Sequence, residues 1–278
     1  MFFLILAILC STVISVIMRL SSEKVSARLS MLAANYLVCS FLGALYADFD
    51  LFCTGQSGFS TAVVLGLING VLFLGGFVLM QDSTRKNGVV LTALFMKLGL
   101  LVPMVVSVLF FDEIPELMQI TGFTLAIAAI FLINMKKDGQ TKAFSFSLIL
   151  LLLFAGGADA MAKVYDYYGN AALSGQFLFY GFLTAFTLCL VLALMKKERP
   201  GIVDLVFGVL IGVPNFFCSR CLLASLGQLP AVVVYPSFSV GTMMLVTVLG
   251  VAAFKERLSK LQWLALVLIL AALVLLNI

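Results

Sequence analysis

The sequence predicts an all-α, polytopic membrane protein with ten transmembrane helices in two inverted-topology repeats of five helices. The first observation is composition: 63% of the 278 residues are hydrophobic and 11% are charged, about half the charge of an average soluble domain. The mean hydropathy is +1.19. The second observation is a series of ten apolar runs, and the third is an internal repeat. Basic residues are dispersed over short loops, which argues against a nucleic-acid partner.

Each apolar run suits a membrane-spanning helix, which takes about 20 residues. Helices are expected because backbone polar groups in lipid must be satisfied within the segment. The first run has no basic residue before its apolar core and no small-residue cleavage site, so we expect a retained helix rather than a signal peptide. The runs cover residues 2–20, 29–47, 59–80, 88–111, 116–135, 144–165, 171–195, 202–224, 230–253 and 260–277.

One stretch recurs 143 positions later, so that Phe111–Asn134 aligns with Phe254–Asn277. In both copies a short charged turn leads into an apolar run. A repeat of this period predicts two membrane-embedded halves, residues 1–138 and 139–278. The matched residues are Phe111 and Phe254, Glu113 and Glu256, Gln119 and Gln262, Ala128 and Ala271, Ala129 and Ala272, and Asn134 and Asn277.

The loop charges predict orientation, because short basic loops remain cytoplasmic. Fourteen of the 17 basic residues lie in odd-numbered loops, whereas the even loops carry acids such as Asp48, Asp50 and Asp166. Both termini are therefore expected on the non-cytoplasmic side. Because each half has five helices, the second half begins on the opposite side from the first. Inverted repeats of this kind are typical of transporters, which expose one shared site to either side alternately.

A second repeat mark is the pair of GxxxG motifs, Gly66–Gly70 and Gly208–Gly212, 142 positions apart. Small residues four apart let helix backbones approach closely in lipid, so we interpret these glycines as packing residues. Asn69, inside the first motif, is a candidate binding residue because a buried amide needs a partner.

The chain resembles the EamA-type carriers of the drug/metabolite transporter superfamily. The resemblance rests on the two inverted halves, on a Glu-containing turn before the last helix of each half, and on the residues named at the end of this paragraph. It implies a central cavity lined by the first, third, fourth, sixth, eighth and ninth helices, with the fifth and tenth helices peripheral or mediating assembly. Cys10-Ser11 stands where the family usually has Trp-Gly. The supporting residues are Gln119 with Gly122, Gln262 with Ala265, and the basic residues Arg19 and Lys163 that close the first helix of each half.

Charged residues inside a span are informative, because each costs a few kcal/mol at the bilayer centre. Lys97 lies about 4–5 Å from the midpoint of its helix. We expect it to face the cavity and to bind an anionic group or exchange a proton; the alternative is a structural pair with Asp159. Arg220 lies near the outer end of its span, where it either extends to the interface or holds a carboxylate or phosphate. A cavity shared by both cations would favour an anionic or zwitterionic solute.

Asp159 and Lys163 lie four residues apart on one helix face, and the simplest interpretation is that they pair. The alternative is that Asp159 is a proton-coupling group, since the chain has no histidine. Pro236 is expected to free backbone carbonyls near Tyr235 and Ser237, as in the broken helices of transporter binding sites. Further candidate binding residues are Asn35, Tyr36 and Asn215.

The sequence therefore predicts a carrier in the inner or plasma membrane that moves a small polar metabolite or drug-like compound. Outward transport and proton coupling are expected. The alternatives are an exchanger of a nucleotide-sugar or phosphorylated metabolite, a lipid-head-group flippase, and an assembly subunit. No enzyme activity, metal or cofactor is expected; the expected partners are the solute, the bilayer and, as a possibility left open, a second copy of the chain.

Overall fold

The computed structural model describes residues 1–52, 55–99, 101–110, 146–229, 231–254 and 260–275, with isolated positions between 117 and 128. The regular elements of the described ranges are helices. They are α1 (Phe2–Lys24), α2 (Arg28–Tyr46), α3 (Phe59–Asn87), α4 (Val89–Leu98), α5 (Leu101–Phe110), α7 (Phe146–Tyr168), the 3-10 helix η1 (Ala171–Leu173), α8 (Ser174–Met195), α9 (Ile202–Leu226), α10 (Ala231–Ala252) and α11 (Lys260–Leu275).

Among the residues that the structure describes, six segments are long and apolar enough to cross a membrane: α1, α2, α3, α7, η1 with α8, and α9. Shorter apolar helices cover Val89–Pro103 and Ser237–Ala252. The chain is an integral, multi-pass membrane protein. The fifth predicted span, 116–135, and both charged turns of the 143-residue repeat lie largely or wholly outside the described residues. Ten spans in two five-helix repeats therefore stay a prediction.

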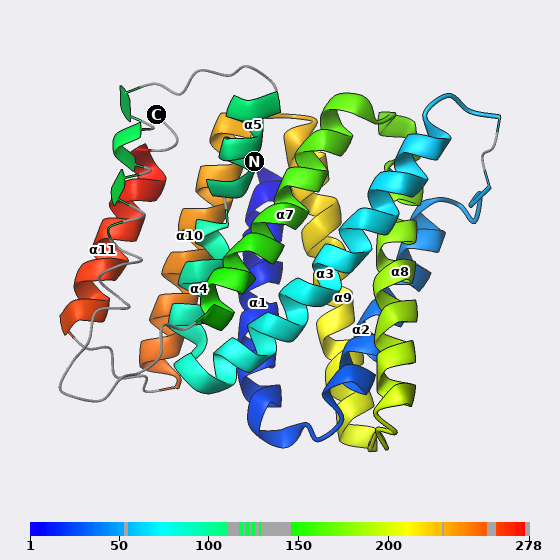
Figure 1. The fold of residues 1–278 in the computed structure, drawn as a ribbon, viewed down its shortest axis with the longest axis horizontal. Coiled ribbons are helices and arrows are strands. Elements are labelled where there is room, and N and C mark those ends of the chain that lie inside the picture. Colours follow the sequence, from blue (N-terminus) through cyan, green and yellow to red (C-terminus); the bar gives the residue numbers. More distant parts are fainter. Residues whose placement is uncertain are drawn as a thin grey trace.

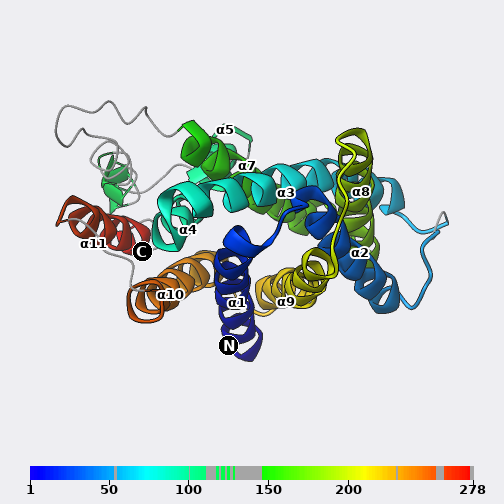
Figure 2. The same ribbon diagram turned by 90° about the horizontal axis from the view of Figure 1, so that it is seen from below.

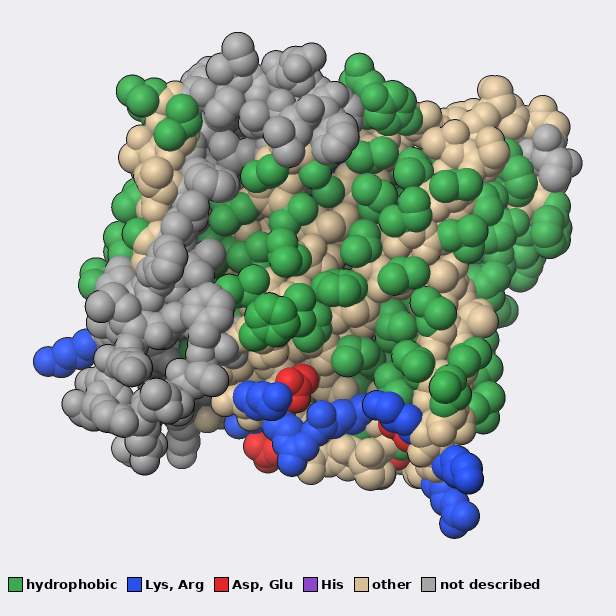
Figure 3. All heavy atoms as spheres, viewed as in Figure 1, with side chains coloured by type: hydrophobic (Ala, Val, Ile, Leu, Met, Phe, Trp, Pro, Cys, Tyr) green, Lys and Arg blue, Asp and Glu red, His purple; other side chains and the backbone are tan. Residues whose placement is uncertain are grey.

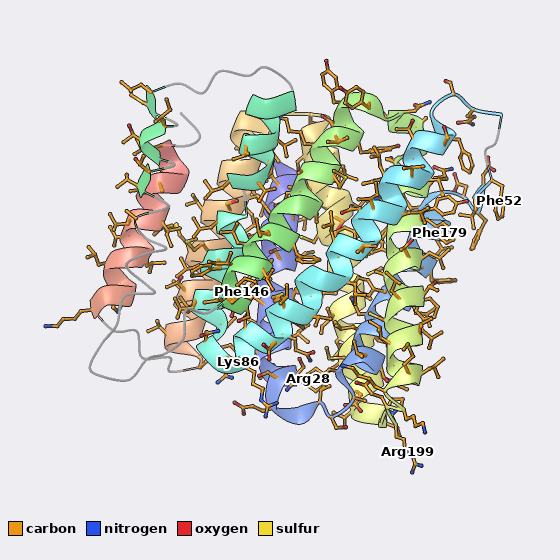
Figure 4. The ribbon with its side chains drawn as sticks, viewed as in Figure 1. Arg28, Phe52, Lys86, Phe146, Phe179 and Arg199 are labelled. Atoms are coloured by element: carbon orange, nitrogen blue, oxygen red, sulfur yellow. The ribbon has the colours of Figure 1, made fainter. Side chains whose placement is uncertain are left out.

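Charged and apolar side chains separate along the bundle. Figure 3 shows Lys and Arg gathered at one end, with hydrophobic side chains over the face beyond them. Figure 4 places Arg28, Lys86 and Arg199 at this end, which we call the basic end, and Phe52 at the opposite end. The gathering of basic loops on one side is thus confirmed for the first, third and seventh loops. α1 begins and α11 finishes away from the basic end (Figure 1); which side of the membrane each end faces stays a prediction.

The helices form a central group of two rows, flanked on one side by α2 and α8 and on the other by α11. α10, α1 and α9 lie in one row, α4, α7 and α3 lie across from them, and α2 and α8 lie at the far side of α3 and α9 (Figure 2). The most extensive contacts join α2 to α8, α3 to α8, α2 to α9 and α1 to α9. α11 lies at the edge against α10 and α4, which confirms the expected peripheral position of the last helix.

The GxxxG motifs bring two helix pairs into backbone contact. A Cβ on Gly66 of α3 would lie 2.9 Å from the Phe177 carbonyl oxygen on α8. A Cβ on Gly212 of α9 would lie 2.7 Å from the Asn35 carbonyl oxygen on α2. The packing interpretation of these glycines is confirmed.

The two close contacts also repeat each other. The residues of α8 that face Gly66 and Gly70 are each 146 positions after the residues of α2 that face Gly208 and Gly212. The α3–α8 and α2–α9 contacts are therefore built in the same way, and each joins a helix of the first half to a helix of the second. The matched residues are Met31 and Phe177, Ala34 and Tyr180, Asn35 and Gly181, and Val38 and Thr184.

A third close approach joins α7 to the fourth predicted span. That span was expected as one helix over 88–111; α4 covers Val89–Leu98 and α5 covers Leu101–Phe110, and Gly99 between them keeps right-handed helical backbone angles (φ −50°, ψ −24°). A Cβ on Gly99 would lie 2.8 Å from the backbone nitrogen of Gly156 on α7. The position 142 residues after Gly99 is Gly241 on α10, where the three atoms nearest to a Cβ would all belong to the side chain of Ile8 on α1, with Cδ1 2.8 Å away.

α3 continues to Asn87, beyond the apolar run that was expected to finish at residue 80. The added turns are polar, and Lys86 Nζ donates to Asp82 Oδ2 at 2.7 Å across one helical turn, a spacing that supports helix. The helix stops at Gly88, whose φ of 83° favours glycine. Hydropathy marks the membrane-embedded part of a helix, whereas capping marks its end.

Two carboxylates connect the first and seventh loops at the basic end. The backbone N–H groups of Leu29 and Ser30 donate to Glu198 Oε1 and Oε2 at 3.3 and 2.9 Å. Ser26 N–H donates to Asp204 Oδ1 at 3.0 Å. Glu198 thus caps the start of α2, where free N–H groups favour an anion.

Candidate functional site

The centre of the bundle holds a cavity of about 130 Å³. Its walls come from α1, α3, α4, α7, α9 and α10, which are the first, third, fourth, sixth, eighth and ninth predicted spans. The expected set of lining helices is therefore confirmed. The lining side chains that carry polar or charged atoms are Ser11, Lys97, Asp159, Asn215, Cys218 and Ser219, and the aromatic ones are Phe73, Phe77 and Phe238.

Lys97 is the central cation of this cavity and is only 6% exposed. Its Nζ donates to Ser11 Oγ at 3.4 Å and lies 3.6 Å from the ring centroid of Phe238. A cation over an aromatic face is attracted by the ring quadrupole, though the gain is about 0.5–2 kcal/mol. Within the described part of the chain, no carboxylate lies within the 4.0 Å of an ion pair with Lys97.

Asp159 lines the same cavity from α7. No ion pair within 4.0 Å joins Asp159 to Lys97 or to Lys163 in the described ranges, although the charges of Asp159 and Lys97 attract each other across the cavity. The backbone explains how the two charges come to one cavity. Lys97 is two residues before Gly99, Asp159 is three residues after Gly156, and the two glycines are in contact.

Two further cavities continue from the central one. A small cavity of about 50 Å³ shares Phe73, Asp159 and Ser219 with it and is also lined by Asn69. A third, of about 190 Å³, shares Leu178 and Leu223 with the small cavity and is lined by Arg220. Lys97 and Arg220 therefore do not share a cavity; they line separate members of one series.

Comparison with known proteins finds a family match for the second half of the chain. Residues 144–278 match the model of the EamA-like transporter family. The second half of this chain is therefore similar to the transporters of this family. An uncharacterized protein of Haemophilus influenzae is 27% identical over 285 residues, which cover 97% of this chain and 95% of that protein. A solved crystal structure with 13% identity matches 99% of this chain and 94% of its own, with a TM-score of 0.65, and shows a shared fold.

The resemblance to EamA-type carriers is thereby confirmed. The EamA-like half contributes Asp159, Asn215, Ser219 and Phe238 to the central cavity. The first half contributes Lys97, together with Ser11 and aromatic residues of α3. The cavity is thus built jointly by the EamA-like half and by the residues that precede it.

Three of the candidate amides and hydroxyls of this EamA-like carrier form a buried group beside the cavity. Asn215 lines the cavity and its Nδ2 donates to Asn35 Oδ1 at 3.2 Å. Asn35 and Tyr36 are fully buried on α2 and are not among the lining residues. Tyr36 packs on the rings of Phe77 and Phe182, with centroids 5.8 and 6.4 Å away. Their part in solute binding stays a prediction.

The remaining candidates fall in different places. Asn69 is 2% exposed, and its Oδ1 has no hydrogen-bond partner among the described residues. Ser237 is half-buried on α10, one position before Phe238, and the side chain of Tyr235 lies outside the described residues. Lys163 is half-buried on α7.

Sequence reasoning did not identify Ser11, Ser219 or Phe238 as cavity residues. Ser11 had a signal, because it follows Cys10 where the family usually has Trp-Gly. No sequence signal distinguishes Phe238 from the other phenylalanines, of which the chain has 25 in total. Its place in the cavity depends on how α10 is rotated towards Lys97.

Proposed function

We propose that the chain is a secondary carrier that moves a small zwitterionic or anionic metabolite by alternating access between two inverted five-helix halves. One observation carries this proposal. Lys97, 6% exposed, stands in a cavity lined by both halves and has no carboxylate within 4.0 Å in the described ranges. Outward movement across the inner or plasma membrane is the direction that the family resemblance supports.

The physical reason is the free-energy cost of burying the ammonium group of Lys97 with no ion-pair partner in the described ranges. An ammonium group taken out of water loses several kcal/mol of hydration, which only a nearby opposite charge or good hydrogen bonds offset. Ser11 and the Phe238 ring offset part of that cost. A solute carboxylate would supply the missing charge. Asp159, on another wall of the cavity, would accept the ammonium group of a zwitterion, and the rings of Phe73 and Phe77 would contact its apolar part.

A thermal-shift screen of the purified carrier tests the solute class, because a ligand stabilises the state that it binds. Neutral L-amino acids are compared with their amides, with their N-acetyl derivatives, with glycerol 3-phosphate and with tetraphenylphosphonium. We expect the largest rise in Tm with the zwitterions and a smaller rise with the N-acetyl acids. A rise confined to tetraphenylphosphonium would contradict the proposal. A rise confined to glycerol 3-phosphate would favour the exchange of phosphorylated metabolites.

Proton coupling is assigned to Asp159 within this proposal, because it is a carboxylate on the cavity wall and forms no ion pair in the described ranges. Asp159→Asn keeps the side-chain size but cannot release a proton. Transport in proteoliposomes should then vary less than about twofold between pH 5.5 and pH 8, whereas the wild-type rate should change severalfold. Asp82→Asn, in the polar last turns of α3, is the matched control and should keep the wild-type profile. A steep profile in Asp159→Asn would remove this residue from coupling.

A further inference from the structure

We infer that the cavity around Arg220 is a second solute site, in series with the central one, that holds the carboxylate and ammonium groups of a zwitterionic solute. This cavity, which we call the Arg220 cavity, has a volume of about 190 Å³. It lies at the end of the bundle opposite the basic end, because α2 begins at Arg28 and reaches the cavity with Tyr46, its last residue. Its other polar lining residues are Tyr165, Asp166, Ser174 and Arg220.

Arg220 is held in this cavity by an aromatic ring rather than by an acid. Its guanidinium carbon lies 4.2 Å from the centroid of the Tyr46 ring. In the described ranges no carboxylate is within ion-pair distance of Arg220. Stacking leaves the edge of a guanidinium group available, and that edge matches a carboxylate with two parallel hydrogen bonds. The arginine is therefore arranged to receive an anion from solution.

The second charge of the Arg220 cavity is Asp166, which lines it from α7. The Arg220 cavity thus offers one cation and one carboxylate that do not pair with each other. The central cavity has the same composition in Lys97 and Asp159. A solute with one positive and one negative group would be matched at both sites, whereas a lipophilic cation would meet an arginine at the first.

The cavities are linked through shared walls. Leu178 and Leu223 line both the Arg220 cavity and the small cavity of about 50 Å³, and Asp159 lines both the small and the central cavities. A solute that moves between the two charged sites would pass these leucines. The small cavity is too narrow for the solute as it stands, so the leucine side chains must rotate; Asn69 lies beside this passage. The Arg220 site extends the proposed carrier, and its test does not depend on transport.

The test uses charged thiol reagents on a cysteine placed at Ala224, which lines the Arg220 cavity. Sulfonatoethyl and trimethylammonium-ethyl methanethiosulfonate are similar in size and opposite in charge. Peptide mass spectrometry reads position 224 separately from Cys218 and Cys221. The measured quantity is the rate of labelling by the anionic reagent divided by the rate of labelling by the cationic one. In Ala224→Cys protein, Arg220→Gln should lower this ratio about tenfold, because one charge about 10 Å away has an effect of this size at an intermediate dielectric constant. Asp166→Asn should raise the ratio. Arg220→Lys keeps the charge, and Lys86→Gln changes a charge at the basic end; both should leave the ratio within about twofold.

Protection then tests the solute class. A mixture of L-alanine, L-leucine and L-phenylalanine should slow labelling at position 224 severalfold, and the corresponding amides should not. Arg220→Gln should abolish this protection. An unchanged rate ratio in Arg220→Gln would overturn the site, and equal labelling with and without the amino acids would overturn the zwitterion assignment. If the protein shows the expected charge selectivity of labelling and the expected protection by amino acids but no transport, the carrier proposal is wrong and the Arg220 site is still supported.

Discussion

Lys97→Met is expected to abolish solute transport while leaving the folded protein at least as stable as wild type. The two effects have one cause. The ammonium group of Lys97 is buried without a carboxylate within 4.0 Å in the described ranges, so its removal relieves a desolvation cost. The solute, in contrast, loses its charge partner, which typically costs 2–5 kcal/mol and predicts a fall of roughly 100-fold or more in kcat/KM. Proteoliposome uptake and thermal melting of the purified protein measure the two effects.

Lys86→Met is the matched control. Lys86 is on the neighbouring helix, its side chain is 63% exposed, and it pairs with Asp82 at the surface. Exposed pairs contribute about 0–1 kcal/mol, so both transport and stability should stay near wild type. Transport at the wild-type rate in Lys97→Met would remove this lysine from the mechanism. A large fall in its melting temperature would instead show a structural role.

Gly70→Ala should destabilise the protein by about 2 kcal/mol, a typical cost of overpacking a close contact. A Cβ at this position would meet the Gly181 carbonyl oxygen and would lie 2.6 Å from Thr184 Cβ on α8. Neither helix can withdraw without separating α3 from α8. Gly208→Ala should cost a similar amount, because its Cβ would meet the Met31 carbonyl oxygen and would lie 2.6 Å from Ala34 Cβ on α2. Thermal melting in detergent measures both changes.

Gly76→Ala on the same helix is the control. The nearest atom to its Cβ would be the backbone nitrogen of Ala155, 4.0 Å away. Alanine is the better helix former by about 1 kcal/mol, so this variant should be as stable as wild type or slightly more stable. Unequal losses in Gly70→Ala and Gly208→Ala would argue against equivalent packing at the α3–α8 and α2–α9 contacts.

The sequence was sufficient for features that depend on local pattern. Hydropathy marks membrane-spanning segments, four-residue glycine spacing marks close helix contacts, and the depth of Lys97 in an apolar run predicts a cavity. The family resemblance added the set of helices around that cavity. Each of these sequence signals is either contained within one helix or present in both halves of the chain.

Features that depend on how helices rotate against one another were not predictable. Asp159 and Lys163 have the spacing of a pair, yet Asp159 lines the central cavity and Lys163 does not. Arg220 and Lys97 were considered as one site, but Leu178 and Leu223, on different helices, separate their cavities. Gly99 also approaches Gly156, which lies far along the chain. Such contacts come from tertiary packing, which no single segment encodes.

The unequal surroundings of Gly99 and Gly241 have a consequence for opening. On one flank of the central cavity, main chain rests on main chain between Gly99 and Gly156, and no rotamer change can loosen it. On the other flank, Gly241 rests on the tip of Ile8, which can swing aside at little cost. Separation of α1 from α10 at Gly241 therefore needs only a side chain to move, whereas separation of α4 from α7 at Gly99 needs main chain to move.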